Sequence, residues 1–211
     1  MRTIICLGDS ITAGKKLPEG QRWSALLQDG LDAATGKGWQ VYNRGIPSET
    51  VTLGLGRFEK DVLPHLPGWV LVEFGLNDCS FLEGREIPRV GPLEFSAVLG
   101  EIIRLVRKGK GLPLLLTNHP PGTTTALGRR CADNLRPYQQ AIRETARQTG
   151  CGLIDMEKLF AASENSAAGL VEDEIHFNAF GHALYASLLQ DAFLSLCATA
   201  PLLHEASPAI S

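Results

Sequence analysis

The sequence has few cysteines and none of the paired-cysteine motifs. Its five cysteines are Cys6, Cys79, Cys131, Cys151 and Cys197, and no two of them form a Cys-x-x-Cys pair. The absence of such pairs excludes a zinc ribbon and a thioredoxin-like redox site. An odd number of widely spaced cysteines is typical of free thiols in a reducing compartment, so we expect the protein in the cytoplasm.

Long hydrophobic runs are also absent. The first apolar run ends at Gly8-Asp9, whereas a signal peptide needs an apolar region of about 7–15 residues followed by a cleavage site. No stretch approaches the roughly 20 apolar residues of a membrane span. We therefore expect neither a signal peptide nor a membrane span.

Clusters of basic residues are missing as well. The chain has 20 Lys and Arg against 23 Asp and Glu, a formal net charge of −3. No basic run is longer than Arg129-Arg130 or Lys15-Lys16. Because a surface that follows phosphates needs several clustered cations, we expect no nucleic-acid partner.

Motifs for phosphate, zinc and α/β-hydrolase sites fail on inspection. Gly14-Lys15-Lys16 resembles the end of a P-loop, but Asp9 stands where the first glycine belongs and Lys16 replaces the Ser or Thr. Gly54-Leu55-Gly56 begins a dinucleotide-binding pattern, but Glu59 takes the third glycine position. Neither His-Glu-x-x-His nor Gly-x-Ser-x-Gly occurs, so no zinc-protease helix or nucleophile elbow is predicted.

Short apolar runs alternate along the chain with longer segments of helical periodicity. The runs cover residues 3–7, 40–43, 69–74, 112–117 and 152–154, and the helical segments cover 22–33, 93–107, 131–149 and 179–197. Continuously apolar strands are typical of a parallel sheet covered on both faces. With right-handed crossovers, this order predicts an α/β fold built as a three-layer α/β/α sandwich. We expect one domain over residues 1–197 and a loosely ordered tail over 198–211.

Polar motifs stand where the expected strands end. Gly8-Asp9-Ser10 follows the first strand, Asn43-Arg44-Gly45 the second, and Gly75-Leu76-Asn77-Asp78 the third, while Asp173 and His176 precede the last helix. Ligands of open α/β sheets bind beyond the carboxyl ends of the strands. We therefore expect these motifs to meet at one edge of the sheet.

Three of these side chains suit acyl transfer. The hydroxyl of Ser10 needs a base to become a good nucleophile, and the imidazole of His176 can act as one. A carboxylate must orient that imidazole, and Asp173 lies three residues earlier, on the same face of a helical turn. Glu172 and Glu174 are close in sequence but lack this spacing. The predicted catalytic residues are Ser10, Asp173 and His176.

Acyl transfer also needs donors for the oxyanion that develops on the substrate. Asn77 offers a side-chain amide, Gly45 an unobstructed backbone N–H, and Ser10 its own N–H. Asp9 and Asp78 are predicted to play supporting roles by accepting hydrogen bonds from loop N–H groups.

Each motif also has a purely structural interpretation. Ser10 is a plausible helix cap, Gly45 a turn glycine, and Asn77-Asp78 a pair of Asx turns. Asp173 is a plausible cap beside a surface His176. Their joint occurrence at successive strand ends favours a hydrolase.

The four motifs together resemble the SGNH (GDSL-type) hydrolase family, which is named for a Ser, a Gly, an Asn and a His in four separate blocks. The blocks occur here in the family's order and span residues 8 to 176. The resemblance implies a flavodoxin-like parallel five-stranded sheet of order 2-1-3-4-5. It also implies a Ser-His-Asp mechanism without metal or cofactor, an acyl-enzyme on Ser10, and an oxyanion hole from Ser10, Gly45 and Asn77.

The chain departs from the family pattern in its second block. The family often has a further glycine three residues after the first, but here Ser48 stands there, after Pro47. Arg44 adds a cation before Gly45. We expect these departures to affect substrate fit rather than chemistry. Glu73 and the segment 12–23 resemble the thioesterase/lysophospholipase-type and arylesterase-type branches.

The main functional prediction is a hydrolase of small-molecule carboxylic esters or thioesters, comparable to an esterase, lipase, acyl-thioesterase or lysophospholipase. One alternative is a carbohydrate O-acetylesterase. An alternative of another class is a non-catalytic flavodoxin-like binding module. The loops 79–91 and 119–130 are expected to shape the substrate pocket. The sequence leaves the acyl chain length and the oligomeric state open.

Overall fold

The computed structural model describes residues 2–36, 38–122 and 132–199, and within them one parallel sheet organises the chain. Its strands are β1 (Arg2–Gly8), β2 (Trp39–Gly45), β3 (Trp69–Glu73), β4 (Leu112–Leu116) and β5 (Gly152–Ile154). The strand order is β2-β1-β3-β4-β5, and every neighbouring pair is parallel. The order implied by the family resemblance is confirmed.

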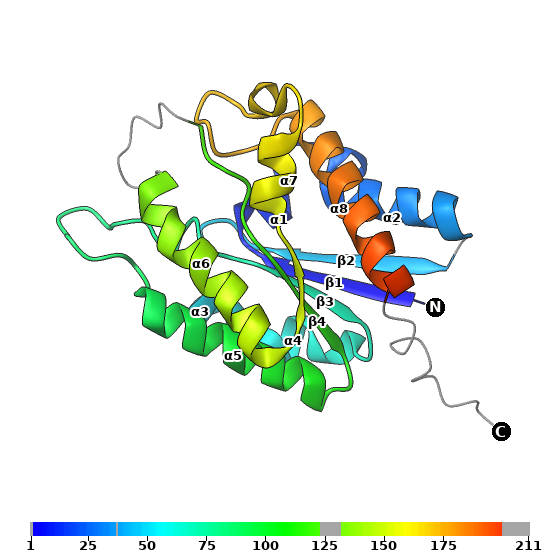
Figure 1. The fold of residues 1–211 in the computed structure, drawn as a ribbon, viewed down its shortest axis with the longest axis horizontal. Coiled ribbons are helices and arrows are strands. Elements are labelled where there is room, and N and C mark those ends of the chain that lie inside the picture. The colour runs from blue at the N-terminus through cyan, green and yellow to red at the C-terminus, as the bar shows by residue number, and fades with distance from the viewer. Residues whose placement is uncertain (1, 37, 123–131, 200–211) are drawn as a thin grey trace.

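Helices cover both faces of the sheet (Figure 1). One face carries α2 (Trp23–Thr35), α7 (Met156–Ala162) and α8 (Ala179–Thr199). The other carries α3 (Val51–Gly56), α4 (Phe58–Asp61), α5 (Pro92–Lys108) and α6 (Ala132–Thr149). Four short elements complete the described residues: α1 (Ser10–Ala13) and the 3-10 turns η1 (Glu19–Gln21), η2 (Leu63–His65) and η3 (Ser166–Gly169). The three-layer architecture is as predicted.

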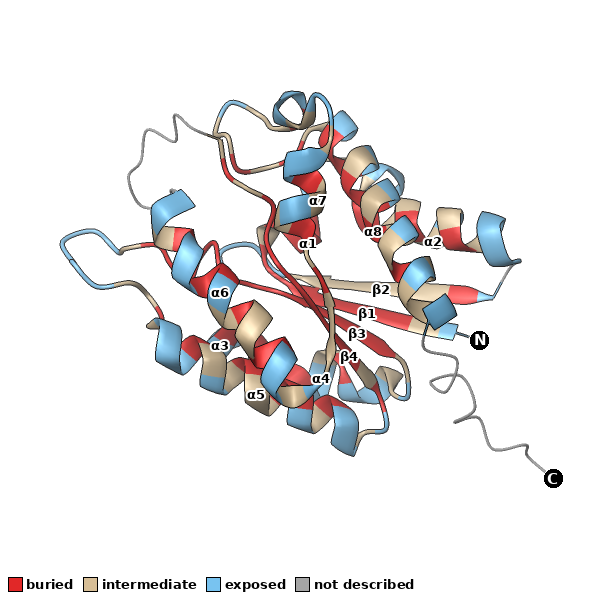
Figure 2. Ribbon diagram, in the orientation of Figure 1, coloured by how far each residue is buried: buried red, intermediate tan, exposed pale blue. Residues whose placement is uncertain are grey.

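The continuous apolar runs occupy the central strands because both faces are buried there (Figure 2). In β1, the side chains of Ile4, Ile5 and Leu7 are fully buried, and every residue of β3 is buried. A strand with one solvated face would alternate apolar and polar residues. The edge strand β2 is only half-buried beyond Trp39, which agrees with its more polar sequence.

The last helix is longer than predicted. Ala198 and Thr199 are helical, and the Thr199 hydroxyl donates to the Ser195 carbonyl at 3.1 Å. The prediction of a loosely ordered tail is therefore wrong for residues 198 and 199, and residues 200–211 lie outside the described residues. None of the described helices combines the length and apolar character needed to cross a membrane.

The four cysteines in the described residues are free thiols. Cys6 and Cys79 are buried, whereas Cys151 and Cys197 are half-buried; Cys131 lies outside the described residues. Burial raises the pKa of the Cys6 thiol far above its ordinary value. Cys6 therefore acts as a small core residue.

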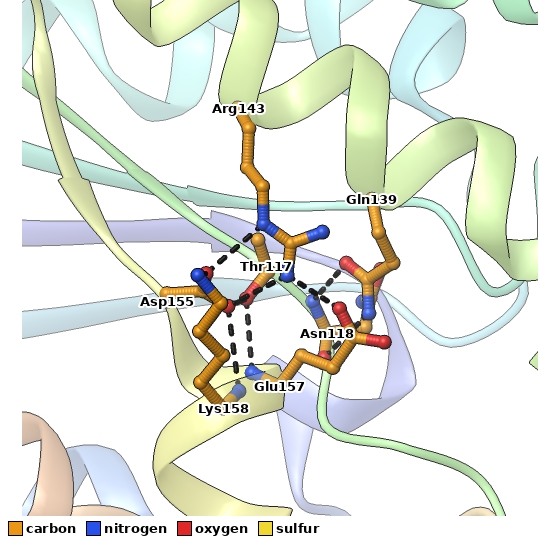
Figure 3. Close-up of polar contacts among 7 residues, drawn as sticks. All are labelled: Thr117, Asn118, Gln139, Arg143, Asp155, Glu157 and Lys158. Atoms are coloured by element: carbon orange, nitrogen blue, oxygen red, sulfur yellow. Dashed lines mark hydrogen bonds and ion pairs between the residues drawn. The ribbon is translucent and has the colours of Figure 1, made fainter.

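A polar network fixes the carboxyl end of β4 (Figure 3). Arg143 donates to Asp155 Oδ2 at 2.9 Å, and the Thr117 hydroxyl donates to Asp155 Oδ1 at 3.1 Å. The Gln139 side chain accepts from the Asn118 N–H at 3.0 Å and donates to the Asn118 carbonyl at 2.7 Å. These contacts come from α6 and the start of α7. They fix Thr117 and Asn118, where the chain leaves β4 at the carboxyl edge of the sheet.

Candidate active site

The four sequence motifs converge at the carboxyl edge of the sheet. In the strand register, Gly8 at the end of β1 is paired with Gly45 of β2 and with Glu73 of β3. The segments that follow these three strands therefore start side by side. The His176 segment reaches the same place from the loop before α8.

Ser10 opens the short helix α1. Asp9 caps this helix, because its Oδ1 accepts the Ile11 N–H at 2.9 Å, and α1 ends at Gly14 with a φ of 58°. The Ser10 N–H belongs to the first turn, whose N–H groups have no acceptor within the helix. An added Cβ on Gly8 would lie 2.1 Å from Thr12 Oγ1, so the tight bend before Ser10 needs glycine at that position.

A chain of hydrogen bonds links Ser10, His176 and Asp173. Ser10 Oγ lies 2.8 Å from His176 Nε2, and His176 Nδ1 lies 2.7 Å from Asp173 Oδ2. The structure thus brings together the three residues predicted to be catalytic.

The segment that holds Asp173 is a turn, not the helical turn that the spacing predicted. Asp173 Oδ1 accepts the N–H groups of Ile175 at 3.0 Å and His176 at 2.8 Å, and Glu174 has a φ of 56°. The Val171 N–H donates to the His176 carbonyl at 2.8 Å and closes the turn. The three-residue spacing still places the carboxylate against the imidazole.

The environment of Asp173 favours its ionised form. Partial burial raises the pKa of this carboxyl, but hydrogen bonds from His176, Lys16 and Ile175 outweigh burial and hold the pKa well below its usual range. An ionised carboxylate at this position fixes the proton of His176 on Nδ1 and leaves Nε2 to face Ser10.

Asp9 and Asp78 accept hydrogen bonds from the loops that follow the strands. Asp9 Oδ2 accepts from Asn77 Nδ2 at 2.9 Å, so Asp9 connects the first and third blocks. Asp78 accepts the N–H of Val51 at 2.9 Å and that of Gly75 at 3.0 Å. Burial is the main cause that raises the pKa of Asp78, to about 7.

Gly45 is placed differently from the prediction. Its N–H donates to Asn43 Oδ1 at 2.9 Å, and an added Cβ would lie 2.1 Å from the Ala13 nitrogen. Glycine is therefore required at position 45 for close packing against α1. Since its N–H is already engaged, the geometry disfavours Gly45 as an oxyanion donor.

Ser48, three residues later, has a backbone that favours glycine. Its φ is 66°, in the left-handed region, and its carbonyl accepts from Arg89 at 2.9 Å. Among the described residues its N–H has no acceptor. This conformation explains in physical terms why glycine suits that position of the second block.

The structure holds two larger cavities beside the segments of the site. One of about 470 Å³ runs along β2 and is lined by Arg44, Gly45 and Lys15 among others. Another of about 550 Å³ lies beside residues 120–122. Of the two loops expected to shape the pocket, residues 123–130 lie outside the described residues. Loop 79–91 contains the antiparallel Phe81–Pro88 bridge and contacts the second block through Arg89 and Ser48.

A buried carboxyl beneath Ser10 had no predicted role in the site. Glu73 Oε2 accepts from the Thr12 hydroxyl and Oε1 from the Tyr185 hydroxyl, both at 3.0 Å, so Glu73 ties α1 to α8 under the sheet edge. Burial, with a smaller contribution from Asp9, raises the pKa of Glu73 to about 8. The signal in the sequence was a glutamate that ends an otherwise apolar strand.

We expect the free energy of unfolding to fall as pH rises, because of Glu73. Its pKa is raised from 4.5 to about 8, so between these values the folded state holds a proton that the unfolded state releases. The contribution is fully present below about pH 4.5 and is lost as pH rises through 8, at up to about 1.4 kcal/mol per pH unit. Urea unfolding of wild type and Glu73→Gln at pH 5 and 8 measures it. The variant should lose less stability over this range, and an equal loss would contradict the assignment.

Comparison with known proteins places these features in a family. Residues 6–184 match the model of the GDSL-like Lipase/Acylhydrolase family. A solved lipase/acylhydrolase from Enterococcus faecalis superposes with a TM-score of 0.79 at 25% identity, over 93% of this chain and 97% of that one.

The names of two curated relatives include a thioesterase and an acetylxylan esterase. The chain is 34% identical over 128 residues to "Thioesterase 1/protease 1/lysophospholipase L1" of Escherichia coli K12, covering 61% of this chain and 55% of that protein. It is 26% identical over 202 residues to the "Acetylxylan esterase" of Geobacillus stearothermophilus, covering 87% and 90%. The first alignment thus spans little more than half of that relative's length. The family match covers most of this chain, and the protein belongs to the GDSL-like lipase/acylhydrolase family.

Proposed function

We propose that the protein is a serine hydrolase that cleaves carboxylic ester or thioester bonds through an acyl-enzyme on Ser10. The observation that carries this proposal is the hydrogen-bond chain from Ser10 Oγ through His176 to Asp173, at 2.8 and 2.7 Å. A nucleophile in contact with a base, and a base oriented by a carboxylate, is the arrangement that acyl transfer requires.

The reaction has two halves. In the first, Ser10 Oγ attacks the acyl carbon while its proton moves to His176 Nε2, and the bond to the leaving alcohol or thiol then breaks as His176 returns the proton to it. In the second, water attacks the acyl-enzyme, gives a proton to His176 and releases the acid as the proton returns to Ser10 Oγ. Asp173 stabilises the imidazolium in both halves.

Three donors are proposed to stabilise the oxyanion: the N–H groups of Ser10 and Ser48 and the side-chain amide of Asn77. Ser48 takes the place predicted for Gly45 because its N–H has no acceptor in the described residues, whereas that of Gly45 donates to Asn43. Asn77 is held beside the first block by its 2.9 Å bond to Asp9.

Replacing Asn77 with alanine is expected to lower kcat by about 100- to 1,000-fold, because one oxyanion donor is lost. KM should change far less, since the charge is absent from the bound substrate. Steady-state kinetics with p-nitrophenyl butyrate measure both constants, and thermal unfolding checks that Asp9, which loses a partner, still supports the fold. A folded variant with kcat within about threefold of wild type would remove Asn77 from the oxyanion hole.

The substrate class can be resolved with a panel of acyl donors. Wild type should hydrolyse p-nitrophenyl acetate or butyrate and acyl thioesters, and the chain-length preference of the thioester series distinguishes a thioesterase from a short-chain esterase. Turnover restricted to acetylated sugars would instead indicate a carbohydrate O-acetylesterase, the activity in the name of the Geobacillus relative.

Labelling with a fluorophosphonate separates a hydrolase from a non-catalytic binding module. A live serine nucleophile should be labelled, and the label should be lost in Ser10→Ala. A folded wild-type protein that neither reacts with the probe nor turns over any member of the panel would contradict the proposal.

We also propose a reducing, cytoplasmic location. The four described cysteines are free thiols, as is typical of a reducing compartment. Fractionation of the source cells should place the protein in the cytosolic fraction, and recovery from an exported or membrane fraction would contradict this.

A further inference from the structure

One carboxylate oxygen of Asp173 contacts both the imidazole of His176 and the ammonium of Lys16. Asp173 Oδ2 lies 2.7 Å from His176 Nδ1 and also 2.9 Å from the Nζ atom of Lys16. Lys16 comes from the segment just after α1, 157 residues earlier in the chain.

A second observation also places Lys16 beside the reacting groups, because Lys16 and Ser10 line the same cavity. A small cavity is lined by Ser10, Lys16, His176 and His182, together with Ile11, Gly14, Lys15 and Phe177. Lys16 therefore lines the same cavity as Ser10 and His176, and its ion pair with Asp173 is not a remote surface contact.

The ammonium of Lys16 disfavours a second positive charge, the imidazolium of His176, on the same Asp173 carboxylate. When His176 takes a proton, the imidazolium is attracted by Asp173, but it is repelled by the ammonium of Lys16 that shares the oxygen. Lys16 and a protonated His176 therefore compete for the same carboxylate oxygen.

We propose that Lys16 is a positioning residue that competes with His176 for Asp173 and thereby sets the pH at which the Ser10–His176 pair becomes competent. This inference rests on the proposed function, because it assigns His176 as the base. It predicts that the enzyme with Lys16 keeps its hydrolytic activity to a lower pH than the enzyme without Lys16.

Other titratable side chains lie near the Ser10–His176 pair. His119 Nε2 donates to the Ile175 carbonyl at 2.7 Å, and burial lowers the pKa of His119 to about 4, so its ring is neutral at neutral pH. Burial likewise lowers the pKa of His182 to about 4. Glu172 and Glu174 line the separate cavity beside residues 120–122. Lys15 and Lys16 both line the cavity with Ser10 and His176, and of these two lysines Lys16 is the one that contacts Asp173.

The ion pair is open to water, which sets the size and salt dependence of its effect. The side chains of Lys16 and Asp173 are 55% and 34% exposed, against 21% for His176. Partly exposed ion pairs shift titrations by about 0.5 pH unit. Salt should screen the contribution of Lys16 more than that of the better shielded Asp173–His176 pair.

The test is an NMR titration of the His176 ring in full-length, histidine-labelled protein, with the resonance assigned from a His176→Gln variant. Lys16→Met should raise the titration midpoint of His176 by about 0.5 pH unit. Lys16→Arg, which keeps the charge, should restore the wild-type midpoint. The control is Lys60→Met, since the exposed Lys60 on α4 lies outside that cavity and makes no ion pair within the described residues, and it should leave the midpoint unchanged.

Salt and kinetics supply two further readouts. The difference between wild type and Lys16→Met should shrink at about 0.5 M salt, and the acid limb of kcat/KM should move with the NMR midpoint. An unchanged midpoint in Lys16→Met, or an equal shift in Lys60→Met, would overturn the inference even if the enzyme is active. A shifted midpoint in a protein that hydrolyses nothing would uphold the inference about Lys16 and refute the proposed function.

Discussion

Ser10→Ala should lower the kcat for ester hydrolysis by about 10⁴- to 10⁶-fold, the loss typical of removing the nucleophile of a serine hydrolase. The hydroxyl at 2.8 Å from His176 Nε2 is the atom proposed to form the acyl bond, and alanine leaves nothing to accept the acyl group. The oxyanion donors remain, so a small acceleration over water should persist. Initial rates with p-nitrophenyl butyrate at high enzyme concentration measure the loss.

The fold should tolerate this change. Ser10 contributes its backbone to α1, whose cap is the side chain of Asp9, so alanine leaves the helix start intact. Ser163→Ala, a serine in the loop after α7, is the matched control and should keep wild-type activity. Ser10→Ala with more than about a tenth of wild-type activity would mean that the hydrolysis has another source.

Asp173→Asn should lower kcat by about 10⁴-fold, the second largest effect expected. An amide in place of the carboxylate can donate to His176 Nδ1, and the imidazole proton then moves to Nε2. A protonated Nε2 can no longer accept the proton of Ser10. The charge that stabilises the imidazolium is lost at the same time. The measurement is kcat across pH 6–9, because a tautomer effect lowers the rate throughout the range.

The neighbouring exposed carboxylate provides the control for Asp173→Asn. Glu172→Gln removes a charge one residue away but makes no bond to His176, and it should retain wild-type kcat. Equal losses in the two variants would show that the segment needs its overall charge, and would contradict a specific role for Asp173.

The sequence was sufficient to locate the hydrogen-bond chain of the site. Ser10 and Asn77 follow apolar strands, and strands of a parallel sheet end at the same edge, so their approach could be predicted before any coordinates. The spacing of Asp173 and His176 also sufficed, although the segment is a turn and not a helix, because a carboxylate three residues before an imidazole can reach it in either conformation. The strand order came from the family resemblance, since periodicity alone does not rank strands.

The features that escaped prediction depend on backbone direction or on distant pairing. Whether Gly45 or Ser48 presents its N–H depends on the φ of 66° at Ser48 and on the Asn43 side chain, neither of which a block pattern records. The ion pair of Lys16 with Asp173 joins residues 157 positions apart. The role of Glu73 depends on Thr12 and Tyr185 meeting beneath one strand. Helices α3, α4 and α7 have four to seven residues each, too few for helical periodicity to be recognised.

The central claim is that Ser10 accepts the acyl group, and mass spectrometry of the trapped acyl-enzyme tests it most directly. Wild-type protein mixed with a slowly hydrolysed ester or thioester, quenched in acid and digested, should gain the mass of one acyl group on the peptide that contains Ser10. Asn77→Ala should carry the same adduct at a lower yield, and Ser10→Ala should carry none. An acyl group on any other residue, or active turnover with Ser10 never modified, would contradict the account.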